Sequence, residues 1–365
     1  MVMNDTLESV ASDLQGGAEL CADELCLAPG GCTLRLRSNS AELIALLADY
    51  FSHVAVAATV PEIDIIAIER DAPETGLAFV DWKREPGKTG RKDSYADLPG
   101  GRVVRKVRTG MVFLQSEPHR IAAGPCIQYA NQVINYINSQ YMNWLQHRGW
   151  LICHAAGLVY QGRGLGIAGF SGGGKSTLML HMLADDAVSY LTNDRLFIRA
   201  GPDGVGARGI PKLPRVNPGT IVHNPKLHGL IPARQREALL NMPSQQLWEL
   251  EDKYDVYVDR VYGDGRIVQQ AALAAVLILN WQRDADAELT VRAVDLAQRP
   301  DLLAALMKSP GPFYSYPDGR FQRDTDDFDE PAYLDTLGQV VVYEACGRID
   351  FSGMARRCIE EILTG

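Results

Sequence analysis

The residues with the clearest chemical potential form a glycine-rich loop, GFSGGGKS, at Gly169–Ser176. The loop matches G-x-x-x-x-G-K-[ST] at every fixed position, with an apolar stretch before it and a helical pattern after it. Gly172, Gly173 and Gly174 let backbone N–H groups turn toward phosphate oxygens without a Cβ in the way. The alternative is a glycine turn with an incidental lysine. The match together with its flanks favours a phosphate-binding loop.

The side chains of this loop have separate expected tasks. Lys175 would place an ammonium group at the β- and γ-phosphates of a nucleotide, and the Ser176 hydroxyl would bind Mg²⁺. Gly169, Ser171 and Thr177 complete the predicted nucleotide contacts, together with the three consecutive glycines. The start of the following helix adds positive partial charge.

Two residues outside the loop are further candidates. A P-loop site needs an acidic group for the metal or the nucleophile, and Asp194 follows the apolar stretch Val188–Leu191, which we expect to run as a strand beside the loop strand. The alternative for Asp194 is a turn residue at a strand end, a common use of Asn-Asp pairs. His154 lies in the apolar run Trp150–Tyr160, which predicts one buried strand. On this pattern alone, a hydrogen-bonded core histidine is favoured over a catalytic one.

The stretch HAAGLVYQGRGLGIAGFSGGGKSTLML, followed by YLTNDRLFI, resembles the HPr kinase/phosphorylase superfamily, and most closely its HPr-kinase-related kinases. The resemblance covers residues 150–198. It implies an α/β fold with a core like those of HPr kinase and phosphoenolpyruvate carboxykinase, ATP and Mg²⁺ as cofactors, and a homo-oligomer. It gives Lys175 and Ser176 the phosphate and metal roles. It places His154 near the transferred phosphate and makes Asp194 the acceptor of the substrate's hydroxyl proton, beside the metal.

The chain departs from this family at identifiable positions. Asn193 replaces the first Asp of the family's pair, and an amide cannot act as a base. Gly209–Thr220 (GIPKLPRVNPGT), where the family has a metal-binding Glu, holds no carboxylate. Lys212 and Arg215 in this stretch could contact phosphate or substrate, and a rigid proline-rich turn is the alternative. The family's arginine signature for phosphorylase activity has no match, so we expect neither the reverse reaction nor HPr as substrate.

These observations predict an enzyme, an ATP-dependent kinase that transfers the γ-phosphoryl group to a hydroxyl, first of all the Ser or Thr of a protein. Two alternatives stay open. The acceptor could be a small-molecule alcohol. The chain could also be an ATPase or nucleotide sensor that transfers nothing to an acceptor, and Asn193 gives this reading some support.

The length of 365 residues fits two domains. Residues 1–125 mix strand patterns with a helix at Ala41–Phe51, which Ser40 can cap, and predict a smaller N-terminal α+β domain of unknown role. Residues 126–365 predict the α/β catalytic domain. Its apolar run Ala272–Trp281 is expected to form a strand in the middle of the sheet.

Composition narrows the possible partners and location. A net charge of -9 argues against a nucleic-acid partner. The sequence has neither an apolar run long enough to cross a membrane nor the start of a signal peptide. The odd number of scattered cysteines, 7, is typical of reduced thiols. We therefore expect a cytoplasmic protein that does not bind membranes.

Overall fold

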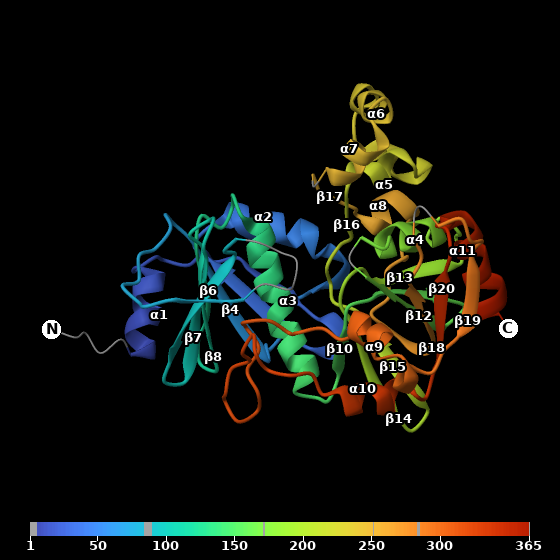
Figure 1. Ribbon diagram of the computed structural model, residues 1–365. Helices are drawn as coiled ribbons and strands as arrows, with labels where there is room; N and C mark the ends of the chain where they lie inside the picture. The colour runs from blue at the N-terminus through green and yellow to red at the C-terminus, as the bar shows by residue number, and fades with distance from the viewer. Residues whose placement is uncertain (1–5, 84–89, 171, 251, 283–284, 365) are drawn as a thin grey trace. The chain divides into compact units, whose positions relative to one another are not determined.

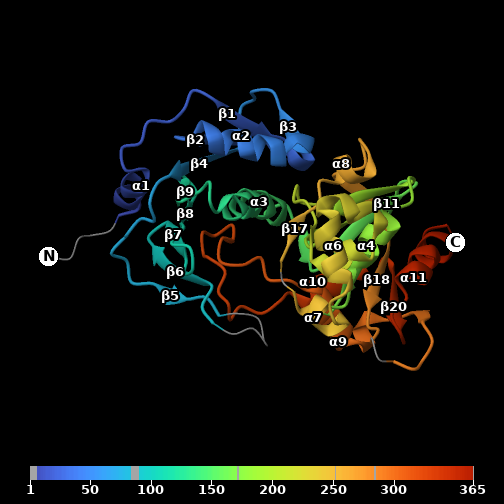
Figure 2. The same ribbon diagram turned by 90° about the horizontal axis from the view of Figure 1, so that it is seen from above.

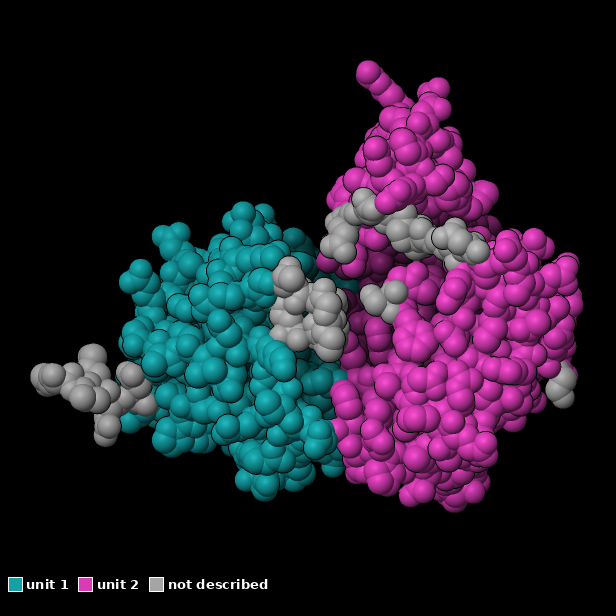
Figure 3. Space-filling view, viewed as in Figure 1, with its two compact units in different colours: residues 1–148, 309–327 teal, residues 149–308, 328–365 magenta. Residues whose placement is uncertain are grey.

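The computed structural model describes residues 6–83, 90–170, 172–250, 252–282 and 285–364. The chain forms two compact units, which Figure 3 colours separately. Unit 1 consists of Met1–Arg148 and Ser309–Asp327, and unit 2 consists of Gly149–Lys308 and Phe328–Gly365. Each unit combines a large mixed sheet with helices, so the chain has the mixed α/β architecture that the sequence predicts.

Unit 1, of which Figure 1 labels the helices α1, α2 and α3, is built on one sheet with the strand order β3-β1-β2-β4-β9-β8-β7-β6-β5, and Figure 2 labels all of these strands. Its strands are β1 (Glu24–Leu27), β2 (Leu34–Ser38), β3 (Ala55–Val56), β4 (Ile63–Glu69), β5 (Val80–Asp81), β6 (Asp93–Leu98), β7 (Gly101–Lys106), β8 (Val112–Ser116) and β9 (Arg120–Gly124). Its helices are α1 (Leu7–Gln15), α2 (Ala41–Tyr50) and α3 (Ala130–Gln146), with 3₁₀ turns at Pro29–Gly31 and Ser52–Val54. The Ser40 hydroxyl accepts the Leu43 N–H and caps α2, as predicted.

Helices α1 and α3 cover opposite faces of this sheet (Figure 2). Val112 packs in the cluster under α1, whereas the next residue, Phe113, contacts Tyr136 of α3 with ring centroids 5.0 Å apart. Successive strand residues point to opposite faces, which accounts for the arrangement. The Tyr136 hydroxyl also donates to the Leu114 carbonyl oxygen. Helix α3 therefore belongs to unit 1, and the predicted domain boundary at residue 125 differs from the observed division after Arg148.

A second segment, Ser309–Asp327, joins unit 1 although it is distant in sequence. The fully buried Arg102 side chain donates to the carbonyl oxygens of Pro312 and Gln322 and forms an ion pair with Asp97. Burying a guanidinium group is costly unless its donors are paired, and these contacts pair them. The segment lies within residues 126–365, the predicted catalytic domain, because local patterns in a sequence do not show which core a loop joins.

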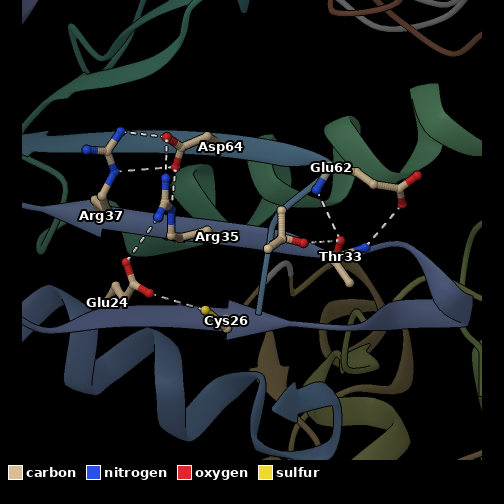
Figure 4. Close-up of polar contacts among 8 residues, drawn as sticks. Glu24, Cys26, Thr33, Arg35, Arg37, Glu62 and Asp64 are labelled. Atoms are coloured by element: carbon tan, nitrogen blue, oxygen red, sulfur yellow. Dashed lines mark hydrogen bonds and ion pairs between the residues drawn. The ribbon is translucent and has the colours of Figure 1, made fainter. Parts of the chain in front are cut away.

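An open part of the unit 1 sheet carries paired charges, drawn in Figure 4. Arg35 and Arg37 on β2 both donate to the Asp64 carboxylate on β4, and Glu24 on β1 forms an ion pair with Arg35. Pairing of β2 with β4 sets Arg35 directly opposite Asp64. Each charge on this strand face therefore meets an opposite charge from a neighbouring strand.

Unit 2 has a mixed sheet with the order β10-β14-β15-β18-β12-β11-β13, and β20 pairs with both β18 and β19. Its strands are β10 (Leu151–Cys153), β11 (Ala156–Tyr160), β12 (Arg163–Gly169), β13 (Val188–Thr192), β14 (Leu196–Gly201), β15 (Gly204–Arg208), β18 (Gln270–Leu279), β19 (Thr290–Ala293) and β20 (Val341–Cys346). Strand β18 runs parallel to β12 and β20. It lies inside the sheet, as its apolar sequence predicts.

Helices cover both faces of the unit 2 sheet. Leu165 and Ile167 of β12 pack in a core with α4 (Lys175–Met182) and α11 (Phe351–Arg357), whereas Ala168 faces the core formed with α9 (Pro300–Leu306) and α10 (Glu330–Leu337). Helix α11 continues as a π-helical turn at Cys358–Leu363, and Leu296–Gln298 forms a 3₁₀ turn. A helical insertion joins the two strands of a small sheet, β16 (Arg215–Val216) and β17 (Tyr254–Asp255). It contains α5 (Pro218–Val222), the 3₁₀ helix Pro225–Leu230, α6 (Ala233–Leu240) and α7 (Ser244–Glu249), and α8 (Val258–Tyr262) follows β17.

Two expectations for unit 2 are wrong. The apolar run Trp150–Tyr160 is not one strand but two, β10 and β11, which break at His154. Strand β13 does not run beside β12, because β11 folds back on β12 as a hairpin and takes the place between them. Asp194 therefore follows a strand that is one position farther from the loop strand than predicted.

Candidate active site

The glycine loop leads from β12 into α4, as its sequence predicts. Gly169 has φ 149° and Gly174 has φ 83°, values that other residues rarely adopt. A Cβ at Gly174 would lie 2.7 Å from the Phe351 ring, and one at Gly169 would lie 2.7 Å from the Leu279 carbonyl oxygen. Both glycines are therefore required by close packing as well as by backbone conformation. Ser171, a predicted nucleotide contact, lies outside the described residues.

The helix that follows the loop presents the predicted polar side chains. The Lys175 ammonium group reaches back across the loop and donates to the Gly169 carbonyl oxygen at 2.9 Å. Ser176 is the second residue of α4 and is half-buried. The Thr177 hydroxyl lies 3.1 Å from the Thr220 hydroxyl, which ties α4 to the start of the helical insertion. Thr177 thus has a structural contact besides its predicted nucleotide contact.

His154 and Asp194 meet in the structure. His154 Nε2 lies 3.2 Å from Asp194 Oδ1, with the side chains 27% and 42% exposed. The break between β10 and β11 places His154 at this position, where its N–H donates to the Leu306 carbonyl oxygen. Asp194 stands in the turn between β13 and β14. The core position that the sequence pattern favours for His154 is therefore wrong, because its side chain lies at the end of a strand and contacts a carboxylate.

The protonation states of this pair follow from their neighbours. Although desolvation opposes it, the Arg195 guanidinium and the His154 hydrogen bond hold the pKa of Asp194 well below its ordinary value. The hydrogen bond to Asp194 favours a charged His154, but desolvation and the Lys175 ammonium outweigh it and lower the pKa of His154. At neutral pH, Asp194 is therefore ionised and His154 is neutral. Their contact then requires the His154 proton on Nε2, because a carboxylate only accepts.

Polar atoms around Asp194 have unused hydrogen-bonding capacity. Asn193 Oδ1 and Arg195 Nη1, on the two residues that flank Asp194, are buried and have no hydrogen-bond partner among the described residues. Arg195 Nε approaches Asp194 Oδ2 only to 3.7 Å. Buried polar groups are paired in most native proteins, so clustered exceptions indicate a place that a ligand, an ion or water completes.

The proline-rich stretch 209–220 lies against β13, the strand that precedes the turn with Asp194. The Tyr190 hydroxyl donates to the Lys212 carbonyl oxygen at 2.6 Å, and a Cβ at Gly209 would lie 1.9 Å from the Leu191 carbonyl oxygen. The Lys212 charge contributes to the low pKa of Asp194. Arg215, in contrast, forms an ion pair with Asp255 at 3.1 Å. Lys212 is thus the residue of this stretch with the closer electrostatic link to Asp194.

The donor set limits the metal that the site can hold. Within the described part of the chain, no group of three or more His, Cys, Asp or Glu side chains could bind a metal by itself. Mg²⁺ does not need such a cage, because it usually takes one or two carboxylates together with substrate phosphates and water. The ionised Asp194 carboxylate and the Ser176 hydroxyl fit that pattern.

An open hollow of about 300 Å³ lies elsewhere in unit 2. Trp150, Arg208, Gln270 and residues 206–207 and 271–272 line it. Ala272 pairs with Arg163 at the start of β12, whereas the loop follows the other end of that strand. The hollow is therefore separate from the glycine loop and contains none of the predicted site residues.

Sequence reasoning missed Arg195, Asp255 and Trp281. Arg195 directly follows Asp194, and its type and place could have suggested a counter-charge. Asp255 pairs with Arg215 only because β16 and β17 are neighbours. Trp281 ends an apolar run, which gives no local sign that its indole Nε1–H donates to the Gly173 carbonyl oxygen.

Comparisons with known proteins give little further guidance. No protein-family model matches the chain, and no curated protein has a matching sequence. Among solved structures, the chain is similar to the HPr(Ser) kinase/phosphatase from Coxiella burnetii, with a TM-score of 0.29 and 12% identity over 57% of this chain and 93% of that chain. This is a distant structural likeness only. Within the described residues, every helix is too short or too polar to cross a membrane.

Proposed function

We propose that the chain is an ATP-dependent phosphotransferase whose phosphate site is the loop Gly169–Ser176. One observation carries the proposal. The helix that begins at Lys175 follows the glycine loop, and the Lys175 charge acts on His154, which in turn contacts Asp194. In this proposal, a phosphate cradle, a cation and an ionised carboxylate are contributed by three parts of unit 2. Phosphoryl transfer requires these three components.

Asp194 has the role of orienting the attacking hydroxyl. Its low pKa makes it a weak base, but phosphoryl transfer through a loose transition state needs positioning more than early proton removal. His154 donates Nε2–H to one carboxylate oxygen and leaves the other, Oδ2, to accept the hydroxyl proton. In this proposal a neutral His154 holds Asp194 in place. The positive charge near the transferred phosphoryl group comes from Lys175.

Mg²⁺ would be held by Ser176 and Asp194, and it would neutralise developing charge on the phosphate oxygens. Binding it also requires the ionised form of Asp194, which the surrounding positive charges favour. Asn193 lies next to this carboxylate, and its buried amide oxygen can accept from a metal-bound water.

The acceptor is a hydroxyl compound, first of all the Ser or Thr of a protein. Small-molecule alcohols are the second candidate class, because Lys212 and Arg195 place cationic groups close to Asp194, where they could bind an acidic metabolite. Incubation of the protein with γ-labelled ATP, cell lysate and, separately, a metabolite pool tests the proposal.

Label in a protein band or in a metabolite, absent with Lys175→Ala, supports phosphoryl transfer and identifies the acceptor class. Release of the label only as free phosphate would contradict transfer and indicate an ATPase. Label that appears equally with Lys175→Ala would show that another protein in the preparation is responsible.

A further inference from the structure

Trp281 contacts the phosphate loop from a neighbouring strand. Its indole Nε1–H donates to the Gly173 carbonyl oxygen at 2.8 Å, and only 7% of the residue is exposed. Strand β18 runs parallel to β12 with Leu279 opposite Gly169. Trp281 therefore leaves the sheet at the point where the glycine loop begins.

Aromatic packing fixes the indole in this place. The Phe351 ring lies edge-on to Trp281 with centroids 5.3 Å apart, and it stacks on His181 at 5.6 Å. The same Phe351 ring fills the space that a Cβ at Gly174 would occupy. Trp281 and Phe351 thus form a support for the loop at Gly173 and Gly174.

The loop needs such a support because its consecutive glycines do not by themselves fix one backbone conformation. Gly172, Gly173 and Gly174 follow one another, and glycine adopts positive and negative φ with nearly equal ease. Gly172 and Gly174 both have positive φ here, 78° and 83°. A peptide plane between two glycines can rotate at little cost, which would turn its N–H away from a bound phosphate.

The hydrogen bond from Trp281 acts on one such plane. In a trans peptide the C=O of one residue and the N–H of the next point in opposite directions, and no described peptide bond is cis. Because the indole holds the Gly173 C=O, it also sets the direction of the Gly174 N–H. We propose that Trp281 is a positioning residue of the nucleotide site, which keeps the Gly174 N–H turned toward the phosphates.

This inference rests on the proposed function, because it assumes that the loop binds nucleotide phosphates. Trp281→Phe keeps an aromatic ring against Phe351 and removes only the donor. Loss of one hydrogen bond that orients a phosphate contact should raise the Kd for MgATP about tenfold. Trp150→Phe is the matched control, because Trp150 lies in the same unit and is also 7% exposed, but it packs on Arg199 and Arg208.

Calorimetric titration of MgATP into the wild-type protein and both variants is the first measurement. The second is the indole ¹H–¹⁵N NMR signal of Trp281, identified by its absence in Trp281→Phe. We expect MgATP to shift this signal, because phosphate binding at the Gly174 N–H polarises the peptide whose oxygen accepts from the indole. A merely structural tryptophan, such as Trp150, should show no such shift.

The outcomes separate the two claims. If the wild-type protein binds MgATP and Trp281→Phe binds it as tightly, the role of Trp281 is wrong and the proposed function stands. An unshifted Trp281 signal at saturating MgATP would also overturn it. If the wild-type protein binds no MgATP, the proposed function fails and the inference fails with it.

Discussion

The two aspartates Asp64 and Asp194 stand in similar electrostatic surroundings but are paired very differently. Asp64 in unit 1 accepts from Arg35 at 3.1 Å with both oxygens and also from Arg37 (Figure 4). Asp194 in unit 2 has His154 at 3.2 Å and Arg195 at 3.7 Å. Desolvation raises the pKa of both carboxyl groups, but the hydrogen bonds and positive charges of their neighbours outweigh it and hold the pKa of each below its ordinary value.

The two aspartates differ in how completely the polar atoms around them are hydrogen-bonded. Around Asp64, two guanidinium groups use the carboxylate fully, which is the arrangement of an ion-pair network that joins strands. Around Asp194, Asn193 and Arg195 keep buried polar atoms without partners among the described residues. Low pKa alone therefore does not distinguish a structural carboxylate from a functional one, and the incomplete pairing around Asp194 is the reason that we propose a function for it.

Substitution of Asp194 should give the largest effect. Asp194→Asn keeps the shape but removes the charge that orients the hydroxyl, so kcat for phosphoryl transfer should fall about 10²–10⁴-fold. Because Asp194 is also a proposed Mg²⁺ ligand, the affinity for MgATP should fall, whereas the affinity for ATP without metal should be nearly unchanged. Steady-state kinetics with calorimetry and thermal unfolding check this prediction. Wild-type turnover in Asp194→Asn would remove the residue from the mechanism.

The corresponding substitution in unit 1 should act in the opposite way. Asp64→Asn weakens the contacts with Arg35 and Arg37, so the free energy of unfolding should fall by about 1–2 kcal/mol. Turnover at a temperature where the variant is folded should equal that of the wild-type protein. Chemical denaturation and the same transfer assay measure both quantities. A loss of turnover without a loss of stability would show that the comparison between the two aspartates is wrong.

The smallest effect should be the pH dependence of stability from His154. Its pKa is lowered in the folded chain, so the unfolded chain binds its proton more readily, and stability rises with pH through the window below the ordinary pKa of about 6.5. His154→Gln should lose this contribution, about 1 kcal/mol or less. Unfolding followed between about pH 5 and 7 for both proteins checks it. A steeper pH dependence in the variant would contradict the direction of the shift.

The sequence was sufficient to predict the features that depend only on neighbouring residues. The glycine loop, the strand before it and the helix after it need only consecutive residues, and Ser40 at the start of α2 is recognisable from its type and position. The apolar run Ala272–Trp281 likewise predicts a buried strand, observed as β18.

The features that local patterns do not predict depend on contacts between residues that are far apart in the sequence. No local pattern shows that His154 stands in a break between two strands, because β10 pairs with β14 while β11 pairs with β12 and β13. The attachment of Ser309–Asp327 to unit 1 depends on Arg102, which bonds to Gln322 across a separation of 220 residues in the sequence. The contact between Trp281 and Gly173 depends in the same way on the parallel register of β12 and β18.

Equilibrium binding of MgATP to the full chain and to Lys175→Ala is the decisive test of a nucleotide site in the glycine loop. We expect saturable binding to the wild-type protein and an affinity at least about tenfold lower for the variant, because the variant lacks the ammonium group that would pair with the phosphates. Unchanged thermal unfolding of the variant would show that its fold is intact. Equal affinity of the two proteins for MgATP, or no binding by either, would contradict a nucleotide site at Gly169–Ser176.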